Sequence, residues 1–595
     1  MINMATLTDA KLNSKVEITG ISFSLGSYSI SSRDKVSSIV DSSRLKDETD
    51  KVVLGLGINR TSVAAKGEDV ITNAALAIIK LIVSYNVDTS KVSNVVIATE
   101  TPHDISQSMA NPVLKLTNKL IDKLNNNGYN IKHLNPEIGM HVQSACTSAG
   151  SAISSYAING LSGYAIIVAT DNAEYKLGTA ADETGGFGSV AVLLEPYEKG
   201  KKGIVLLDKI GHYSDEVPDF IKVIFDDNYS SSGLSLVARY PIVFGKFSEE
   251  AYSLAIFEAL KRISENTGIP INNRKMLESY DLISHLPYPK IPEKLLAYLI
   301  RHLSRTDSSL KEDLSVDLGI LNSSGTMLKE SFLPGFDSLE DEFKFIIKFE
   351  SLYNNAVGLS SEIKGRMSER KNEMDSFLNA GNTKDEVKSI IWEIENISSE
   401  FESNTDILEL LGNCKESFLM LLESDKIGEK DIENAFKPIM DVINEFEKED
   451  NVYNKSIRSS KIFKQIKEEL HIEEAVKLSK EIGNIYTGSI LIGLVSYLTN
   501  VKKPKNNLLL TFYGSGFESY VIEAIPNIDE NFISLLDRNV ENEFARQRII
   551  DGETYIKIRK NAYDDAKIPL SRDNIFRVDF INEGEFLDEI KKYKN

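Results

Sequence analysis

Residues 142–150 have the sequence VQSACTSAG, in which Cys146 separates a strand-like run from small residues that can begin a helix. A cysteine at a helix N-terminus feels the positive end of the helix dipole, which lowers its pKa and favours the nucleophilic thiolate. The small neighbours leave room for a bound group beside the sulfur. Two interpretations stay open from spacing alone, because a buried cysteine that only packs would suit the same pattern.

Strand-like and helical runs alternate on both sides of this turn. β-Branched apolar runs of strand length occupy residues 94–99, 164–171, 189–195, 204–208, 280–283 and 507–512. Continuous runs of this kind are typical of buried strands. Residues 71–85 have apolar side chains at helical spacing on one face. The alternation continues to about residue 301 and returns after residue 472, so the sequence predicts a layered α/β fold.

Residues 307–459, between these two blocks, differ in composition and have helical spacing. They hold 33 acidic and 17 basic side chains, so they carry −16 of the chain's formal charge of −20. We interpret them as an acidic helical insert, either a docking or oligomer surface or a solvated decoration that binds nothing. The last seventy residues are charged, with strand-like runs at 555–558 and 576–580, and the sequence does not indicate their role.

Bulk composition argues against several classes of protein. The 595 residues are 42% hydrophobic, which allows a sizeable core, and a sequence pI near 5.0 argues against nucleic acid as the main partner. The only cysteines are Cys146 and Cys414, without a CxxC motif, so we expect no disulfide framework and no metal site. We assign Cys414 to packing. Without a signal-peptide pattern or an apolar run of about 20 residues, we expect a cytoplasmic protein outside the membrane.

Polar residues beside strand ends are candidates for chemistry. Glu100 follows the strand-like run at 94–99, where partial burial would raise its pKa and suit general acid/base catalysis. His285 follows the run at 280–283. Each has a plainer interpretation, as a solvated loop acid and a structural histidine. Two glycine-bearing turns, GNIYTGS at 483–489 and YGSG at 513–516, offer donors for an oxyanion, although Asn484 could equally cap a helix.

The order of these motifs resembles the thiolase-like condensing enzymes, and more closely the 3-hydroxy-3-methylglutaryl-CoA (HMG-CoA) synthases. The resemblance covers about residues 16–305 and 460–525. Its stretches are GLGIN at 55–59, IATET at 97–101, SACTSAG at 144–150, ATDNAEYKLGTAADETGGFGSVAV at 169–192, YPIVFGKFSEEAY at 240–252, HLPYPKIPEK at 285–294, GNIYTGS and YGSG. Glu100 separates this family from ketoacyl synthases, which use Cys, His and Asn without that acid.

Two departures from the family pattern affect the substrate side. The family usually has Glu two residues before the nucleophile and an aromatic or small residue after it, where this chain has Ser144 and Thr147. The family's aromatic-Arg-Pro segment is not recognisable in residues 217–236. These departures bear on the CoA contacts and on the identity of the acceptor.

The resemblance implies a role for each matching residue. Cys146 would accept an acetyl group from acetyl-CoA, Glu100 would take a proton from the acetyl methyl and act again in hydrolytic release, and His285 would polarise the carbonyl of acetoacetyl-CoA. The implied substrate contacts are Asn484 and Ser515 for the acetoacetyl thioester, Tyr175 and Thr184 for the pocket, and Lys290 and Lys294, four residues apart on one helix face, for the CoA phosphates. No metal or organic cofactor is implied.

The resemblance also implies a fold and partners. The expected fold is a five-layer αβαβα sandwich of two related halves, residues 1–200 and residues 201–306 with 460–595, which carries 307–459 as the insert. The implied protein is an acyltransferase of the mevalonate pathway to isoprenoids, and it would form a homodimer. The resemblance also allows a complex with acetoacetyl-CoA thiolase and an OB-fold bridging protein. Two alternatives stay open. One is a related condensing enzyme, ketoacyl synthase III-like or with an acceptor on an acyl carrier protein, and the other is a non-catalytic scaffold.

Overall fold

Nine strands form one mixed sheet in the order β13-β14-β15-β8-β1-β7-β6-β4-β5. The computed structural model describes residues 15–40, 43–65, 67–222, 224–225, 236–237, 240–271, 273–321, 330, 332–358, 384–424, 426–502, 504–565 and 583–594. The strands are β1 (Val16–Leu25), β4 (Val92–Ala98), β5 (Ile138–Val142), β6 (Tyr164–Asn172), β7 (Phe187–Pro196), β8 (Gly203–Ser214), β13 (Tyr280–Ser284), β14 (Asn507–Gly514) and β15 (Glu518–Asn527). They contain almost the whole of the six strand-like runs between residues 94 and 512.

The sheet consists of two halves that repeat one arrangement. In the first half β1 is antiparallel to β7, β7 is antiparallel to β6, and β6 is parallel to β4. In the second half β8, β15, β14 and β13 have the same order and the same directions. The halves join through a short pairing of residues 16–18 in β1 with residues 204–206 in β8. Consequently β4, before Glu100, and β13, before His285, hold equivalent places.

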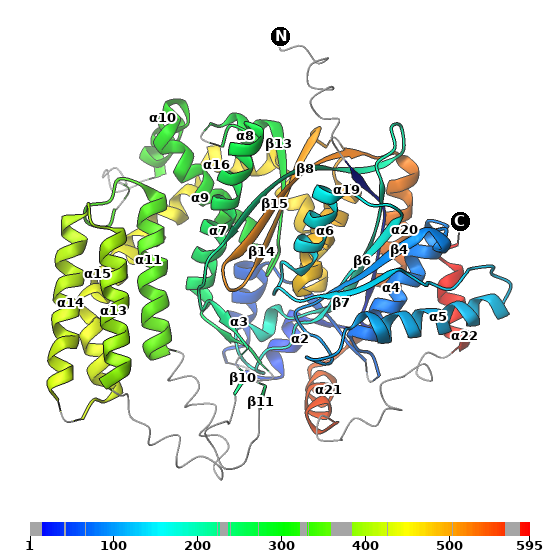
Figure 1. The fold of residues 1–595 in the computed structure, drawn as a ribbon, viewed down its shortest axis with the longest axis horizontal. Helices are drawn as coiled ribbons and strands as arrows, with labels where there is room; N and C mark the ends of the chain where they lie inside the picture. The colour runs from blue at the N-terminus through cyan, green and yellow to red at the C-terminus, as the bar shows by residue number, and fades with distance from the viewer. Residues whose placement is uncertain are drawn as a thin grey trace.

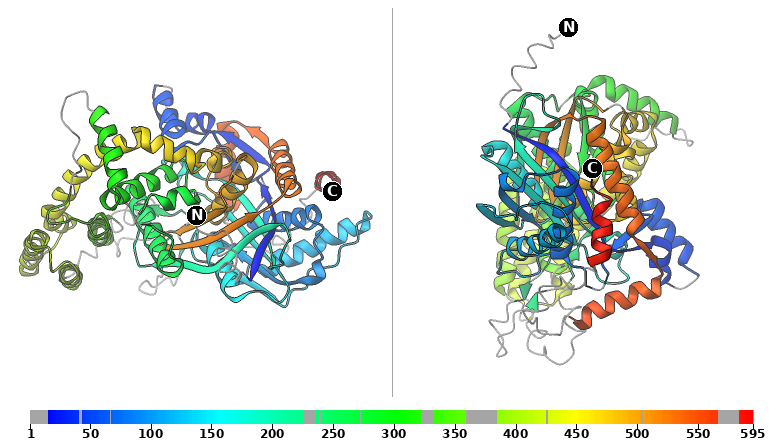
Figure 2. Two further views of the ribbon diagram at one scale, coloured as in Figure 1. Left: turned by 90° about the horizontal axis from the view of Figure 1, so that it is seen from above. Right: turned by 90° about the vertical axis from the view of Figure 1, so that its right-hand side faces the viewer.

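Helices cover both halves and also lie between them (Figure 1 and Figure 2). Helices α4 (Val70–Ser84) and α5 (Ala110–Asn126) pack outside the first half, and α7 (Gly245–Thr267) and α9 (Ile291–Thr306) pack outside the second. Helix α6 (Ser148–Asn159) contacts strands of both halves and shares a hydrophobic cluster with α19 (Ser489–Asn500). The layers therefore follow the order αβαβα, which confirms the fold that the family resemblance implies.

Local sequence explains how the buried helix α4 begins, and a distant segment of the chain explains how the helix tolerates a buried charge. The Asp69 carboxylate accepts hydrogen bonds from the backbone N–H groups of Ile71 and Thr72, and the Thr72 hydroxyl accepts one from the Asp69 N–H, which completes a capping box. Every residue of α4 is buried, including Lys80. The Lys80 ammonium pairs with Glu543 and with Glu589, 2.8 Å away. The C-terminal part of the chain thereby compensates a charge buried near the N-terminus.

The insert is a helical bundle with its own hydrophobic core, seen beside the body in Figure 1. Its helices are α11 (Leu339–Tyr353), α13 (Lys384–Glu400), α14 (Thr405–Glu423) and α15 (Glu429–Ser459). Helix α10 (Ser308–Leu321), at the start of residues 307–459, instead packs in the hydrophobic core of the second half. Cys414 is fully buried in that core, and its thiol donates to the Ala435 carbonyl. On the body, Arg301 of α9 is 1% exposed and pairs with three insert acids, Glu330, Glu342 and Asp450. These ion pairs fasten the insert to the second half.

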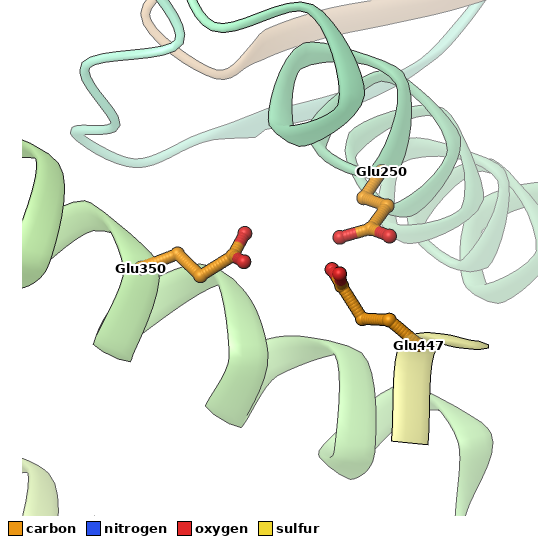
Figure 3. A group of neighbouring side chains, drawn as sticks. All are labelled: Glu250, Glu350 and Glu447. Carbon is orange, nitrogen blue, oxygen red and sulfur yellow. The ribbon is translucent and has the colours of Figure 1, made fainter. Parts of the chain in front are cut away.

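Three carboxylates meet where the insert contacts α7. Glu250 of α7, Glu350 of α11 and Glu447 of α15 point toward one another (Figure 3), and one carboxylate oxygen from each lies within 4.8 Å of the other two. Lys246 pairs with Glu250 at 3.4 Å and also with Glu447. Burial raises the pKa of Glu250, and burial next to Glu447 raises the pKa of Glu350 to about 7. Protonation and Lys246 together therefore limit the repulsion between insert and body.

The C-terminal segment differs from the sequence prediction. Residues 555–558 belong to helix α21 (Gly552–Asp565) and not to a strand. The Asp551 carboxylate accepts a hydrogen bond from the Thr554 N–H, so the chain enters a helix despite its β-branched residues. The strand-like run at 576–580 lies outside the described residues. None of the described helices has the length and apolar character needed to cross a membrane.

Candidate active site

Cys146 lies in the turn between β5 and α6, where its thiol donates a hydrogen bond to Glu100. The distance from Sγ to Glu100 Oε2 is 2.9 Å. Cys146 is 7% exposed and Glu100 is 6% exposed, so the pair is screened from water. Ala145 has a φ of 42°, a left-handed conformation that is rare outside glycine, and its carbonyl accepts from the Ser148 hydroxyl at 2.7 Å. The strained turn and its hydrogen bond fix the direction of the thiol.

The pKa of Cys146 is raised well above its ordinary value, whereas the helix-dipole argument predicted that it would be lowered. Burial is the main cause, and the adjacent Glu100 carboxylate adds to it. Helix α6 begins at Ser148, so Cys146 lies before its first turn, and the dipole is outweighed. The protein therefore holds a protonated thiol whose hydrogen-bond acceptor is Glu100.

Asp171, at the end of β6, anchors the loop that carries Glu100. One of its carboxylate oxygens accepts from the Thr99 hydroxyl and the Glu100 N–H at 2.8 Å each, and also from Thr101. The other oxygen accepts from the Thr487 N–H at 3.1 Å, in the turn before α19. Sequence reasoning missed this residue, although an acid that ends a continuous apolar strand is a usable signal.

Lys222 is the second residue that sequence reasoning missed. Its ammonium lies 3.7 Å from Glu100 Oε1 and 5.1 Å from the centroid of the Tyr486 ring. Burial raises the pKa of Glu100, and the Lys222 charge opposes that rise. No motif marks Lys222 in the sequence, because its partner is more than a hundred positions away along the chain. It lies in the segment where the family's aromatic-Arg-Pro pattern was not recognised.

An aromatic and amide wall surrounds the thiol. Tyr175 packs edge-on against Tyr486, with ring centroids 5.8 Å apart, in one cluster with Cys146. The Asn484 amide donates to the Tyr175 hydroxyl at 3.3 Å and accepts from the Tyr486 N–H at 2.8 Å. The Asn484 N–H donates to the Thr184 carbonyl at 2.7 Å. The structure thus brings together three of the sequence candidates, Tyr175, Thr184 and Asn484, beside Cys146.

His285 follows β13 and is 2% exposed. Its backbone N–H donates to the Thr511 carbonyl, and its backbone carbonyl accepts from the Tyr252 hydroxyl, both at 2.8 Å. The ring Nδ1 has no hydrogen-bond partner among the described residues. Burial lowers the pKa of His285 to about 3, so the ring is neutral at neutral pH. A neutral, otherwise unengaged imidazole can donate or accept one hydrogen bond to a bound group.

Ser515 belongs to a hydrogen-bond network that reaches the backbone of His285 through packed tyrosine rings. Its side chain hydrogen-bonds Asp219, which also accepts from the Tyr513 hydroxyl at 2.7 Å and the Gly516 N–H at 2.8 Å. Burial raises the pKa of Asp219 to about 6. Tyr513 packs on Tyr252, whose hydroxyl meets the His285 carbonyl. Ser515 is therefore linked to the His285 region, with its hydroxyl engaged by Asp219.

The two lysines proposed for CoA phosphates differ from the expectation of one helix face. Lys290 is the N-cap residue of α9 and lies before the helix, and Lys294 is in its first turn. The Lys290 ammonium pairs with Glu293 at 2.8 Å, and Lys294 pairs with Glu249. Both charges are therefore engaged by acids of this chain, and a phosphate would have to compete with them.

Comparison with known proteins shows similarity to hydroxymethylglutaryl-CoA synthases. The family model "Hydroxymethylglutaryl-coenzyme A synthase N terminal" matches residues 36–199, which include Glu100 and Cys146. The hydroxymethylglutaryl-CoA synthase of Haloferax volcanii is 23% identical over 339 residues, 54% of this chain and 67% of that protein. That of Saccharomyces cerevisiae is 28% identical over 287 residues, 45% of this chain and 51% of that protein. The chain thus spans about half to two thirds of the length of these relatives.

Solved structures share the fold over most of the chain. The structure of MvaS in complex with 3-hydroxy-3-methylglutaryl coenzyme A has a TM-score of 0.51 and 16% identity, and the alignment covers 94% of this chain and 93% of that one. The HMG synthase of the curacin biosynthetic pathway, in complex with apo donor-ACP, has a TM-score of 0.52 and 13% identity, covering 97% and 94%. Both likenesses identify the fold.

Proposed function

We propose that this chain, an HMG-CoA synthase-like protein of the thiolase type, condenses acetyl-CoA with acetoacetyl-CoA to form HMG-CoA. The observation that carries the proposal is the buried hydrogen bond between Cys146 and Glu100, enclosed by Tyr175, Tyr486 and Asn484. A thiol paired with a carboxylate in a water-poor site supplies a nucleophile and a base together. The product would serve the mevalonate pathway to isoprenoids.

The first step is the transfer of acetyl to Cys146. The thiol proton passes to Glu100, the sulfur forms a bond to the acetyl carbonyl carbon, and the bond from that carbon to the CoA sulfur breaks. The departing CoA takes the proton from Glu100 and leaves as a thiol. The raised pKa of Glu100, caused by its burial, supports this exchange, because the carboxyl holds a proton more readily than an exposed carboxyl and can then return it.

The second and third steps form the carbon–carbon bond and release the product. Glu100 removes a proton from the acetyl methyl, and the resulting carbon nucleophile adds to the ketone of acetoacetyl-CoA. The neutral His285 ring donates a hydrogen bond to the ketone oxygen, which becomes an alkoxide. The alkoxide then takes up the proton that Glu100 removed from the acetyl methyl. Water then cleaves the Cys146 thioester, and the carboxylate of HMG-CoA and the free thiol are formed. CoA thioesters are the only substrates besides water, and we propose no cofactor.

Labelled acetyl-CoA tests this function. We expect acid quenching to trap label on Cys146, and later addition of acetoacetyl-CoA to release labelled HMG-CoA and free CoA. The fully folded Cys146→Ala variant is the control for non-specific labelling. Label that is absent from Cys146, or an acetyl-enzyme that never yields HMG-CoA, would contradict the proposal.

A second candidate is a related synthase whose acceptor is bound to an acyl carrier protein. The observation that favours it is the pairing of Lys290 and Lys294 with Glu293 and Glu249, which leaves less free charge for CoA phosphates. The same acetyl-enzyme, offered acetoacetyl groups on CoA and on a carrier protein, separates the two candidates. A rate at least about tenfold higher with the carrier protein, equivalent to about 1.4 kcal/mol, favours the second.

Lys222 sets the pH at which Glu100 works. Replacement of Lys222 by methionine removes the cation 3.7 Å from Glu100 Oε1, so the pKa of Glu100 rises further and the carboxylate is protonated at a higher pH. We expect the acid limb of the kcat/KM profile to move up by about one pH unit, the lower end of the effect of one neighbouring charge. Lys222→Arg keeps the charge and should keep the limb. An unchanged profile for Lys222→Met would exclude this role.

Location and assembly are further parts of the proposal. We place the protein in the cytoplasm, because a working thiol needs a reducing compartment, and both cysteines are unpaired. A homodimer is supported by β5, an edge strand of the sheet that exposes 51% of Ile138 and 37% of Met140. A complex with acetoacetyl-CoA thiolase and an OB-fold bridging protein rests on the family resemblance alone.

A further inference from the structure

Helix α21 of the C-terminal segment brings a buried arginine to the wall of the thiol site. Arg559 is 6% exposed. Its guanidinium donates to the Asp182 carboxylate at 2.7 Å, to the Tyr175 carbonyl at 2.5 Å and to the Tyr555 hydroxyl at 2.6 Å. One side chain, about 400 positions further along the chain, therefore holds both ends of residues 175–182.

The held loop is the one that encloses Cys146. Tyr175 belongs to the aromatic cluster around the thiol, and its hydroxyl accepts from Asn484 at 3.3 Å. Thr184 lies two residues after the loop, and its backbone carbonyl accepts from the Asn484 N–H at 2.7 Å. A shift of the loop would therefore move the Tyr175 ring and the Asn484 amide together, beside the position of the acetyl group.

The anchor for the arginine is itself buried and charged. Asp182 is 1% exposed, and its backbone carbonyl accepts a hydrogen bond from Lys35, which is also 1% exposed. The Tyr555 hydroxyl donates a hydrogen bond to the Asp182 carboxylate at 3.2 Å. The Lys35 ammonium lies over the Tyr555 ring, 5.1 Å from the centroid of that ring. Buried charges are costly, so a cluster with this arrangement orders its surroundings strongly when it is complete.

We propose that Arg559 is a positioning residue that sets the reactive geometry at Cys146 through Tyr175 and Asp182. This inference rests on the proposed function for its kinetic consequences and assigns a role to the C-terminal segment. The planar guanidinium can bond the carboxylate and the carbonyl at the same time. A lysine there keeps the charge opposite Asp182 but cannot reproduce both bonds.

Arg559→Lys separates positioning from simple charge balance. We expect the variant to fold, with a kcat lowered on the order of 10²-fold, as for a misplacement of ~1 Å, and KM values within about twofold of the wild type. Alkylation of Cys146 by iodoacetamide, followed by mass spectrometry at that residue, should become about fivefold faster or more as the wall loosens. Alkylation requires no substrate. It therefore tests the role of Arg559 even if the wild-type protein is not acetylated by acetyl-CoA and the proposed function is refuted.

The matched control is Arg546→Lys. Arg546 is also a largely buried arginine that bonds a carboxylate, Glu543, and a backbone carbonyl, that of Leu25, but it does not contact residues 175–184. We expect it to leave kcat and the alkylation of Cys146 close to those of the wild type. Equal losses in Arg546→Lys and Arg559→Lys would overturn the inference, as would a folded Arg559→Lys with wild-type kcat and alkylation.

A milder variant covers the case in which Arg559→Lys does not fold. Tyr555→Phe removes one hydroxyl that supports both Arg559 and Asp182 and leaves every charge in place. We expect a decrease in kcat and an acceleration of Cys146 alkylation, each about two- to fivefold, in line with the loss of one supporting hydrogen bond. A folded Tyr555→Phe that matches the wild type in both measurements would overturn the inference.

Discussion

Replacement of Cys146 by serine is expected to abolish the acetyl-enzyme and to lower kcat on the order of 10⁴-fold or more. A serine hydroxyl is far less acidic than a thiol, and at this position burial and the adjacent Glu100 carboxylate already disfavour ionisation. The measurement is the yield of trapped label from acetyl-CoA, together with the steady-state rate of HMG-CoA formation. The effect should be the largest of any single substitution in the chain.

The other cysteine provides the matched control. Cys414 is also buried but lies in the insert core, where its thiol donates to the Ala435 carbonyl. Cys414→Ser is expected to retain label and rate. Loss of label in Cys414→Ser with retention in Cys146→Ser would reverse the assignment of the nucleophile.

Replacement of Glu100 by glutamine is expected to separate acetylation from condensation. Glu100 accepts the thiol proton during acetylation, so its loss should slow that step. Its carboxylate also contributes to the raised pKa of the thiol, so its removal lowers that pKa and partly offsets the loss, and we expect a slower acetylation that still proceeds to completion. No base then remains at the acetyl methyl, and condensation should fall on the order of 10³-fold, the range of general acid–base catalysis. Trapped acetyl-enzyme should accumulate when acetoacetyl-CoA is present.

Glu17→Gln serves as the control for this variant. Glu17 is a fully buried acid of β1 whose pKa is also raised by burial. Its carboxylate accepts a hydrogen bond from the backbone N–H of Glu198, outside the residues described for the thiol site. Its replacement should leave both half-reactions intact. A Glu100→Gln variant that condenses at the wild-type rate would remove Glu100 from the mechanism and leave Cys146 without its proposed base.

Much of the site follows from the strand pattern. Continuous apolar runs identify strands buried on both faces, and the residues at their ends must lie at the sheet edge where helices begin. The pattern predicts such positions for Glu100 and His285, and in the structure they follow β4 and β13, strands that occupy equivalent places in the two halves. Local sequence carries this information because the strand period and its ends are local properties.

The charge state of the thiol does not follow from local sequence. The helix dipole, which acts over a single turn, predicts by itself a lowered pKa for Cys146. Burial and the Glu100 carboxylate outweigh the dipole and raise that pKa. Both are produced by segments distant along the chain, and electrostatic effects depend on distance in space and on the exclusion of water.

The sequence by itself determined the α/β class, the acidic helical insert and the identities of Glu100, Cys146 and His285 as candidates, because periodicity, composition and strand ends are written locally. Only the tertiary structure decided the partners that act on them. Asp171 holds the Glu100 loop, Lys222 balances its charge, and Arg559 reaches the Tyr175 loop from a helix near the C-terminus. These contacts join residues tens to hundreds of positions apart, and only packing of the whole chain brings such groups into hydrogen-bond range.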